Sequence, residues 1–311
     1  MNYEELLKEL VLNDERIMVL TSENRAAIRN LPEQIGDRFI DVGISEQTMI
    51  GIAAGLALRG RIPVAHALAT FLTMRAFEFI RTDVGIANLP VKLVGAVPGF
   101  LSEANGPTHQ AIEDVSLMRG IPNVNVFCPA DEEDMLIGLR EVLLSGSPFY
   151  IRFNNLKSAV KHNLDFVIGK AEVISCGNDI TILTFGMLLR QAYEAMIILE
   201  SKGLSVRLIN LRTLKPIDEE VIINAAEETS LIVTLEDHFI TGGLYSILGE
   251  IFLKNNLTNN VLPIALDNKW FKPALLQDIL NYEGFTGPQI AERIINHFQT
   301  KTDTIKIKSL I

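Results

Sequence analysis

The stretch RFIDVGISEQTMIGIAAGLAL, residues 38–58, joins a short apolar strand to a long helix of small residues. Residues 39–42 have the pattern of a buried strand, and residues 45–58 have the composition of a closely packed helix. The same alternation extends to both sides over the first half of the chain. Further strands are expected at 17–20, 62–67, 91–97, 124–127 and 149–153, and further helices at 3–12, 70–86 and 132–144. Strands that alternate with helices predict a mostly parallel sheet covered on both faces.

The second half of the chain repeats this alternation after a polar stretch. Residues 154–169 are rich in Asn, Lys and Ser, and we interpret them as a linker with a boundary near residue 160. Strands are then expected at 180–185, 205–209, 231–235 and 261–266, and a last helix at 287–297. The sequence predicts an α/β protein with two domains, residues 1–160 and 170–311, each a mostly parallel sheet flanked by helices. The residues from Lys301 onward are expected to form a tail.

The composition excludes several classes of protein. Of the 311 residues, 48% are hydrophobic and 21% are charged, which is typical of a soluble globular protein. No stretch of about 18 residues lacks a charge, so no membrane-spanning helix is expected. The net charge of −10 and the absence of a basic cluster argue against nucleic-acid binding. The charged, amphipathic N-terminal helix does not resemble a signal peptide, and a cytoplasmic protein is expected.

The two cysteines do not suggest a metal site. Cys128 and Cys176 both lie in apolar stretches of the sequence and are expected to be buried free thiols. The chain has no CxxC motif and no Cys/His pair at the spacing of a zinc site.

A carboxylic acid at a helix start is the first candidate for chemistry. Ser45 can cap the helix that begins there, and Glu46 falls in its first turn, where the helix dipole favours a carboxylate. Glu46 could simply support the cap. Because the following residues are apolar or small, its carboxyl group would be partly desolvated, and it is also a candidate proton donor.

A loop histidine is the second candidate. In Asn105-Gly106-Pro107-Thr108-His109-Gln110, the Gly-Pro pair fixes a turn that presents Thr108 and His109. This loop follows the carboxyl end of an expected parallel strand, where open α/β sheets bind ligands. A lone loop histidine is more often an exposed polar residue, so the pattern alone leaves both interpretations open.

Taken together, these segments resemble the transketolase family of thiamine-diphosphate enzymes. The resemblance covers about residues 5–300 and rests on the order and spacing of several short motifs, which are found at residues 38–47, 51–57, 70–72, 106–110, 121–123, 211–218, 236–238 and 242–243. Transketolases have a diphosphate-binding, a pyrimidine-binding and a C-terminal domain. This chain resembles the second and third, and it lacks the Gly-Asp-Gly motif of the first. The resemblance implies one subunit of a split transketolase.

The resemblance also assigns roles at the cofactor. Glu46 would bind the pyrimidine ring nitrogen and so promote loss of the thiazolium C2 proton, after which the cofactor acts as an electron sink. Phe71 would stack on the pyrimidine ring, although it could also be an ordinary core residue. Met74 would lie near the ring edge. Glu23 stands near the cofactor, where the family usually has Asp.

Three residues are assigned to the substrate in the same way. His109 would act near the reacting carbonyl as a proton shuttle or hydrogen-bond donor, and Asn105 would face a substrate hydroxyl. Arg152 would bind the substrate phosphate; as an arginine in an apolar strand it indicates either a ligand or a buried partner carboxylate. The family usually has Asp at the position of Asn105 and a sugar-phosphate-binding His at that of Val97. These losses suggest a non-standard substrate, such as one without the usual phosphate.

The implied activity is transfer of a two-carbon ketol unit between sugars or sugar phosphates. It would need a diphosphate-binding subunit carrying the Mg²⁺ ligands, in an α₂β₂ heterotetramer that also self-associates through the family interface. Other thiamine-diphosphate enzymes remain as alternatives, namely a deoxyxylulose-phosphate-synthase-like enzyme or the beta subunit of a 2-oxoacid dehydrogenase. A non-catalytic transketolase-like module is a further alternative, against which the presence of Glu46, Phe71 and His109 argues.

Overall fold

The first half of the chain forms most of a seven-stranded sheet. The computed structural model describes residues 1–308, with side chains as far as residue 298. The strand order is β10-β5-β6-β4-β3-β1-β2, and all neighbours are parallel except β10 and β5. The strands are β1 (Ile17–Thr21), β2 (Phe39–Asp41), β3 (Ile62–Leu68), β4 (Lys92–Ala96), β5 (Asn125–Phe127), β6 (Phe149–Arg152) and β10 (Thr213–Lys215). The second half thus contributes one edge strand, β10, which the sequence did not predict because so short a strand shows no periodicity.

The second half forms a five-stranded sheet of its own. Its order is β12-β11-β8-β9-β7, with only the edge strand β7 antiparallel to its neighbour. The strands are β7 (Glu172–Ser175), β8 (Ile180–Thr184), β9 (Val206–Asn210), β11 (Leu231–Phe239) and β12 (Val261–Leu266). The predicted fold class, two mostly parallel sheets flanked by helices, is therefore confirmed.

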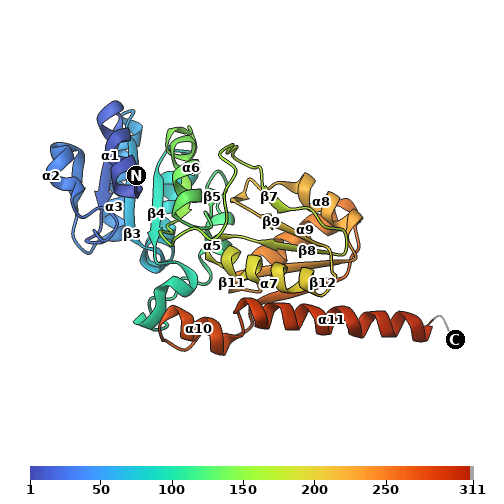
Figure 1. Cartoon of the computed structure of the whole chain (residues 1–311). Coiled ribbons are helices and arrows are strands. Elements are labelled where there is room, and N and C mark those ends of the chain that lie inside the picture. The colour runs from blue at the N-terminus through green and yellow to red at the C-terminus, as the bar shows by residue number, and fades with distance from the viewer. Residues whose placement is uncertain (309–311) are drawn as a thin grey trace.

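Helices flank both sheets, which lie side by side (Figure 1). Those of the first half are α1 (Tyr3–Asn13), α2 (Leu31–Ile35), α3 (Glu46–Leu58), α4 (Phe77–Phe79), α5 (Asp114–Arg119) and α6 (Glu132–Leu144). Those of the second half are α7 (Leu189–Ser201), α8 (Glu219–Glu228), α9 (Leu244–Asn255), α10 (Leu276–Glu283) and α11 (Gly287–Lys308). None of the helices within residues 1–308 has the length and apolarity needed to span a bilayer.

Three local expectations are corrected. The helix predicted over 70–86 is divided by two wide π-helical turns, η2 (Phe71–Arg75) and η3 (Ile80–Gly85). In the first, the Thr73 hydroxyl donates to the Ala69 carbonyl, a bond that often bends helices. Cys128 is buried as expected, but Cys176 is exposed. The predicted tail from Lys301 continues α11 as far as Lys308, and its last residues, 309–311, lie outside the described part of the chain.

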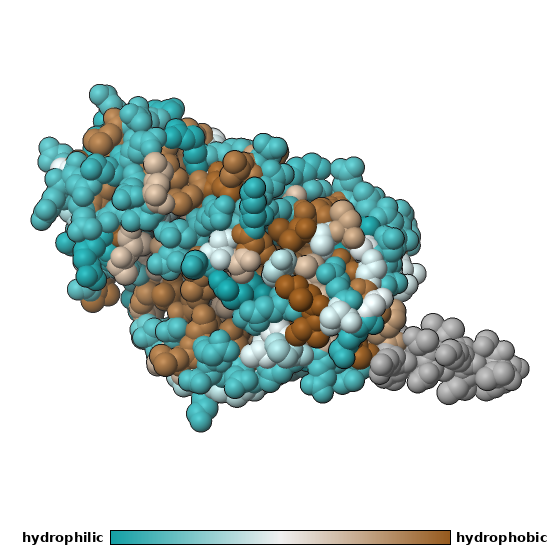
Figure 2. All heavy atoms as spheres, viewed as in Figure 1, coloured by the Kyte–Doolittle hydropathy of each residue, from teal (hydrophilic) through white to brown (hydrophobic). Residues whose placement is uncertain are grey.

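The apolar core is continuous between the two halves. One cluster joins Val126 and Tyr150 of the first sheet to Leu183 and Leu214 from the second half. On the face shown in Figure 2, hydrophilic side chains cover most of the surface and hydrophobic ones appear in patches near the middle of the molecule. The two halves therefore pack through a shared interior and not through a solvated gap.

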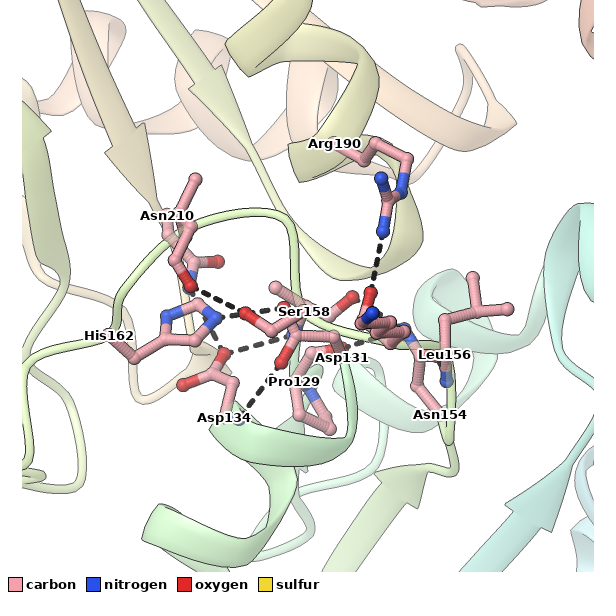
Figure 3. Close-up of polar contacts among 12 residues, drawn as sticks. Pro129, Asp131, Asp134, Asn154, Leu156, Ser158, His162, Arg190 and Asn210 are labelled. Carbon is pink, nitrogen blue, oxygen red and sulfur yellow. Dashed lines mark hydrogen bonds and ion pairs between the residues drawn. The ribbon is translucent and has the colours of Figure 1, made fainter.

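The segment between the two sheets is more buried than a solvated linker. His162, at its centre, donates from Nε2 to Asp131 at 2.9 Å and from Nδ1 to Glu172 at 2.8 Å. Figure 3 shows its ring pointing into a polar cluster with Asp131 and Asp134, at the start of α6, and Asn210 of β9. Composition alone suggested an open linker, because it does not show which polar side chains find buried partners.

Candidate active site

A hollow of about 510 Å³ opens at the carboxyl ends of neighbouring parallel strands. β1 ends at Thr21 and β3 at Leu68, and the loop after β2 leads into α3. The hollow is lined by Ser22, Glu23, Asn24, Ile44, Glu46, Leu68 and Phe71. It brings together three residues that the sequence assigned to the cofactor: Glu23, Glu46 and Phe71. Met74 is half-buried on the same turn as Phe71 and is not among the lining residues.

Glu46 is the first residue of α3, and its side chain is only 2% exposed. The Ser45 hydroxyl donates to the Val42 carbonyl at 3.0 Å and does not cap the helix, contrary to expectation. The Ser45 amide donates instead to the Ser22 hydroxyl, which in turn donates to the Gly43 carbonyl. These bonds join the loop after β1 to the start of α3, so they fix the position of Glu46.

Arg75 is a site residue that sequence reasoning missed. Its Nη1 donates to Glu46 Oε2 at 2.9 Å, and its guanidinium carbon lies 4.2 Å from the centroid of the Phe71 ring. Arg75 follows Phe71 by about one turn and is the only charged residue in the stretch 70–77. That isolated charge is the signal that could have revealed it.

The contacts of Arg75 with Phe71 and Glu46 indicate which kind of group the hollow can hold. The guanidinium is planar and cationic, and it stacks on an aromatic face while it donates to a buried carboxylate. A protonated or amino-substituted pyrimidine makes the same two demands, a stacking face and an acceptor at the ring edge. Phe71 and Glu46 therefore fit the ring of thiamine diphosphate.

His109 lies at the edge of the same site. Its ring centroid is 5.1 Å from that of Phe71 in an edge-to-face contact, and its carbonyl accepts from the Thr70 hydroxyl at 2.7 Å. The Thr108 hydroxyl lies 2.9 Å from His109 Nδ1. Asn105 is exposed, and its amide donates to the Ser102 carbonyl at 2.8 Å. The structure thus brings His109, but not Asn105, to the aromatic side of the hollow.

Arg152 lies buried between the two halves of the chain. Its side chain is 3% exposed; Nε donates to Asp114 at 2.8 Å and Nη1 to Asp237 at 2.8 Å. Asp237 also accepts from the amide of Phe100 at 3.3 Å, and a Cβ at Gly99 would overlap with its carboxylate. Arg152 therefore bonds two buried carboxylates between the halves of the chain, and the structure does not support its expected phosphate contact.

A second polar cluster must be considered for a metal. Ligand atoms of Asp134, His162 and Glu172 lie within 4.8 Å of one another. However, the Arg212 guanidinium lies 2.7 Å from Asp134 and 3.1 Å from Glu172, and both nitrogens of His162 already bond carboxylates. The positive charge of Arg212 would repel a divalent cation, so we assign no metal to these residues.

Comparisons with known proteins cover both halves of the chain. Residues 2–159 match the family model described as transketolase, pyrimidine binding domain, and residues 169–290 match that of the transketolase C-terminal domain. The chain belongs to the transketolase family. Membership of this family implies dependence on thiamine diphosphate, and the chain is a transketolase-type transferase subunit.

Two relatives show how much of this family the chain spans. It is 37% identical to the 6-deoxy-6-sulfo-D-fructose transketolase subunit SqwH of Clostridium sp. (strain MSTE9), over 81% of this chain and 80% of that protein. It is 32% identical to the putative transketolase C-terminal section of Methanocaldococcus jannaschii, over 96% of this chain and 95% of that one. Among solved structures, a split gene transketolase, in the form of an inactive beta4 tetramer, superposes with a TM-score of 0.86 at 30% identity, over 96% of this chain and 97% of that one.

Proposed function

We propose that this chain is the pyrimidine-binding subunit of a split transketolase that transfers a two-carbon ketol unit between sugars. The proposal rests chiefly on one observation: a buried carboxylate, Glu46, and a half-buried aromatic ring, Phe71, line the same hollow at the carboxyl ends of parallel strands. The names of the similar proteins, a transketolase subunit and a transketolase C-terminal section, support it.

Each residue of the hollow would have a defined task. Bound thiamine diphosphate would supply a nucleophilic carbon for the ketose carbonyl and an electron sink for the carbon–carbon bond that breaks. Glu46 would hold a proton between its carboxyl group and the pyrimidine ring nitrogen, and Phe71 would orient the ring by stacking. His109 would donate a hydrogen bond to the sugar at its reacting end. Glu23, exposed at the rim, would face the cofactor, and Met74 would lie near the ring edge.

A diphosphate-binding subunit would complete the site. We propose that this partner carries the Mg²⁺ ligands, that the assembly is α₂β₂, and that the chain also self-associates through the family interface. The beta4 tetramer of the similar split gene transketolase, which is inactive, supports both a self-associating chain and the need for a partner. We also propose that the enzyme is cytoplasmic, because charged sugars do not cross membranes unaided. The proposed domains are residues 1–160 and 170–311.

The substrate would be a sugar whose terminal group is not held in the usual way. Val97 offers no hydrogen-bonding side chain, Asn105 is uncharged, and the guanidinium of Arg152 is bound by two carboxylates. The similarity to a 6-deoxy-6-sulfo-D-fructose transketolase subunit makes a sugar with a terminal sulfonate the first donor to assay. Xylulose 5-phosphate with ribose 5-phosphate is the comparison pair, and pyruvate with glyceraldehyde 3-phosphate tests the synthase alternative.

Calorimetric titration with thiamine diphosphate and Mg²⁺ tests the split site. The chain alone should bind weakly or not at all, whereas the chain purified with its diphosphate-binding subunit should bind and catalyse ketol transfer. Tight, Mg²⁺-dependent binding by the chain alone would refute the split site. Binding by the complex without ketol transfer from any of these donors would refute the transketolase activity.

A further inference from the structure

The C-terminal half of the chain holds the loop that carries His109. Gln110 Nε2 donates to the carbonyl of Phe271 at 2.8 Å, across the boundary between the halves. The Leu276 amide donates to Glu103 on the same loop at 3.3 Å. α10 packs against this loop at the bottom of the view in Figure 1. The Phe100 ring, at the loop's start, contacts the ring of Phe271 at 5.2 Å between centroids.

Gln110 is well suited to fix the histidine beside it. Its side chain is 1% exposed, and its Oε1 has no hydrogen-bond partner among the described residues. Since the Phe271 oxygen can only accept, the amide must point its NH₂ group toward the C-terminal half. The contact to Phe271 is therefore the bond that holds this buried side chain.

The His109 carbonyl, next to Gln110 in the chain, is held by a residue of the first half. The Thr70 hydroxyl donates to the His109 carbonyl, and Thr70 precedes Phe71, whose ring touches the His109 ring. His109 is thus held by the first half through Thr70 and by the second half through Gln110. Neither bond involves the imidazole nitrogens directly, so both leave the ring able to act on a substrate.

We propose that Gln110 is a positioning residue for His109. Its hydrogen bond to the Phe271 carbonyl fixes the His109 loop to the C-terminal half of the chain. The hydrogen bond between Gln110 and Phe271 does not depend on any assumed activity, whereas its effect on turnover rests on the proposed function. Without this bond the buried Phe271 carbonyl loses a donor and the loop can shift. A displacement of about 1 Å at a reacting group can cost about 100-fold in rate.

Gln110→Met tests this inference, because methionine fills a similar volume without an amide. Gln191→Met is the matched control, since Gln191 is also buried and bonds a backbone group, the Gly287 amide, but within the C-terminal half. The full chain, labelled at its 5 histidines, gives ¹H–¹³C ring signals, and His109→Asn identifies the signal of His109. Gln110→Met should shift or broaden that signal alone, and Gln191→Met should leave it in place.

The assembled enzyme supplies the second readout. Gln110→Met should lower kcat by about 10- to 100-fold with little change in thiamine-diphosphate affinity, whereas Gln191→Met should leave kcat nearly unchanged. An unchanged His109 signal in Gln110→Met, or an equal change in Gln191→Met, would overturn the positioning role. The spectrum decides this even if no ketol transfer is found. Should Gln110→Met not fold, Gln110→Asn takes its place, because its amide is one methylene too short to reach Phe271.

Discussion

Arg75 donates to the buried carboxylate of Glu46 across 2.9 Å while its guanidinium lies over the ring of Phe71. The pair links the start of α3 to the wide turn η2, two segments that meet at the mouth of the same hollow. Glu46 is 2% exposed and Arg75 40% exposed, so one charge is withdrawn from water and the other is not. In the isolated chain, Arg75 thus contacts the same carboxylate and the same aromatic face that the cofactor ring would contact.

Replacing Glu46 by Gln should abolish most of the activity without unfolding the chain. The amide oxygen can still accept from Arg75, but the side chain can no longer exchange a proton with a ring nitrogen. Turnover of the assembled enzyme should fall by about 10²–10⁴-fold. Steady-state kinetics and thermal unfolding of the same preparation check both parts, with Glu33→Gln, exposed on α2, as the control. Unaltered turnover in Glu46→Gln would favour a structural role.

Replacing Arg75 alone should destabilise the chain, and replacing Glu46 as well should recover most of the lost stability. Arg75→Met leaves a buried carboxylate without its cation, and we expect the free energy of unfolding to fall by about 1–2 kcal/mol. In the double variant Glu46→Gln/Arg75→Met no charge is left uncompensated, so most of that loss should disappear. Urea unfolding of the four proteins gives the coupling energy. Additive losses would mean that the pair contributes nothing.

Arg152 should behave as a structural residue. Arg152→Gln would leave Asp114 and Asp237 buried without a cation, and the free energy of unfolding should fall by about 3–5 kcal/mol. Arg140→Gln is the control: Arg140 pairs with Glu9 where both side chains are about half exposed, and its loss should cost less than about 1 kcal/mol. A small loss of stability together with a raised KM for a phosphorylated sugar would restore the phosphate-binding role.

The sequence could predict the site where strand topology alone brings residues together. Glu23, Glu46 and Phe71 follow the ends of β1, β2 and β3, and parallel neighbours present these ends at one edge of the sheet. The same reasoning placed His109 in the loop after β4. For Glu46 and His109 the prediction needs only the position of each residue after its strand, whereas Glu23 and Phe71 are assigned through the resemblance to the transketolase family.

Pairings across the two halves could not be predicted in this way. Arg152 bonds Asp237, 85 positions further along the chain, and nothing in the local pattern of either residue identifies the other. The sequence left open whether this arginine faced a ligand or a carboxylate, and only the packing of the two halves decides it. Arg75 was missed because the side of the helix on which its side chain lies depends on the π-helical turn, whereas a regular helix was expected.

The charge on His162 should make stability depend on pH. Burial alone would lower the pKa of His162, but the hydrogen bonds to Asp131 and Glu172 outweigh it and raise the pKa to about 10. The ordinary pKa of histidine is about 6.5. The native state therefore holds a proton that the unfolded chain releases above that value, so the stabilisation is complete below about pH 6.5 and is lost as the pH rises toward 10.

His162→Gln removes this titration. Wild type should lose stability relative to this variant between about pH 6.5 and 10, so that the difference in their urea midpoints shrinks across this range. His66→Gln is the control: burial lowers the pKa of His66 to about 4, so that this residue is neutral in both states above pH 7. Its difference from wild type should stay constant from pH 7 to 10. A constant difference for His162→Gln as well would show that the imidazole between Asp131 and Glu172 carries no extra proton.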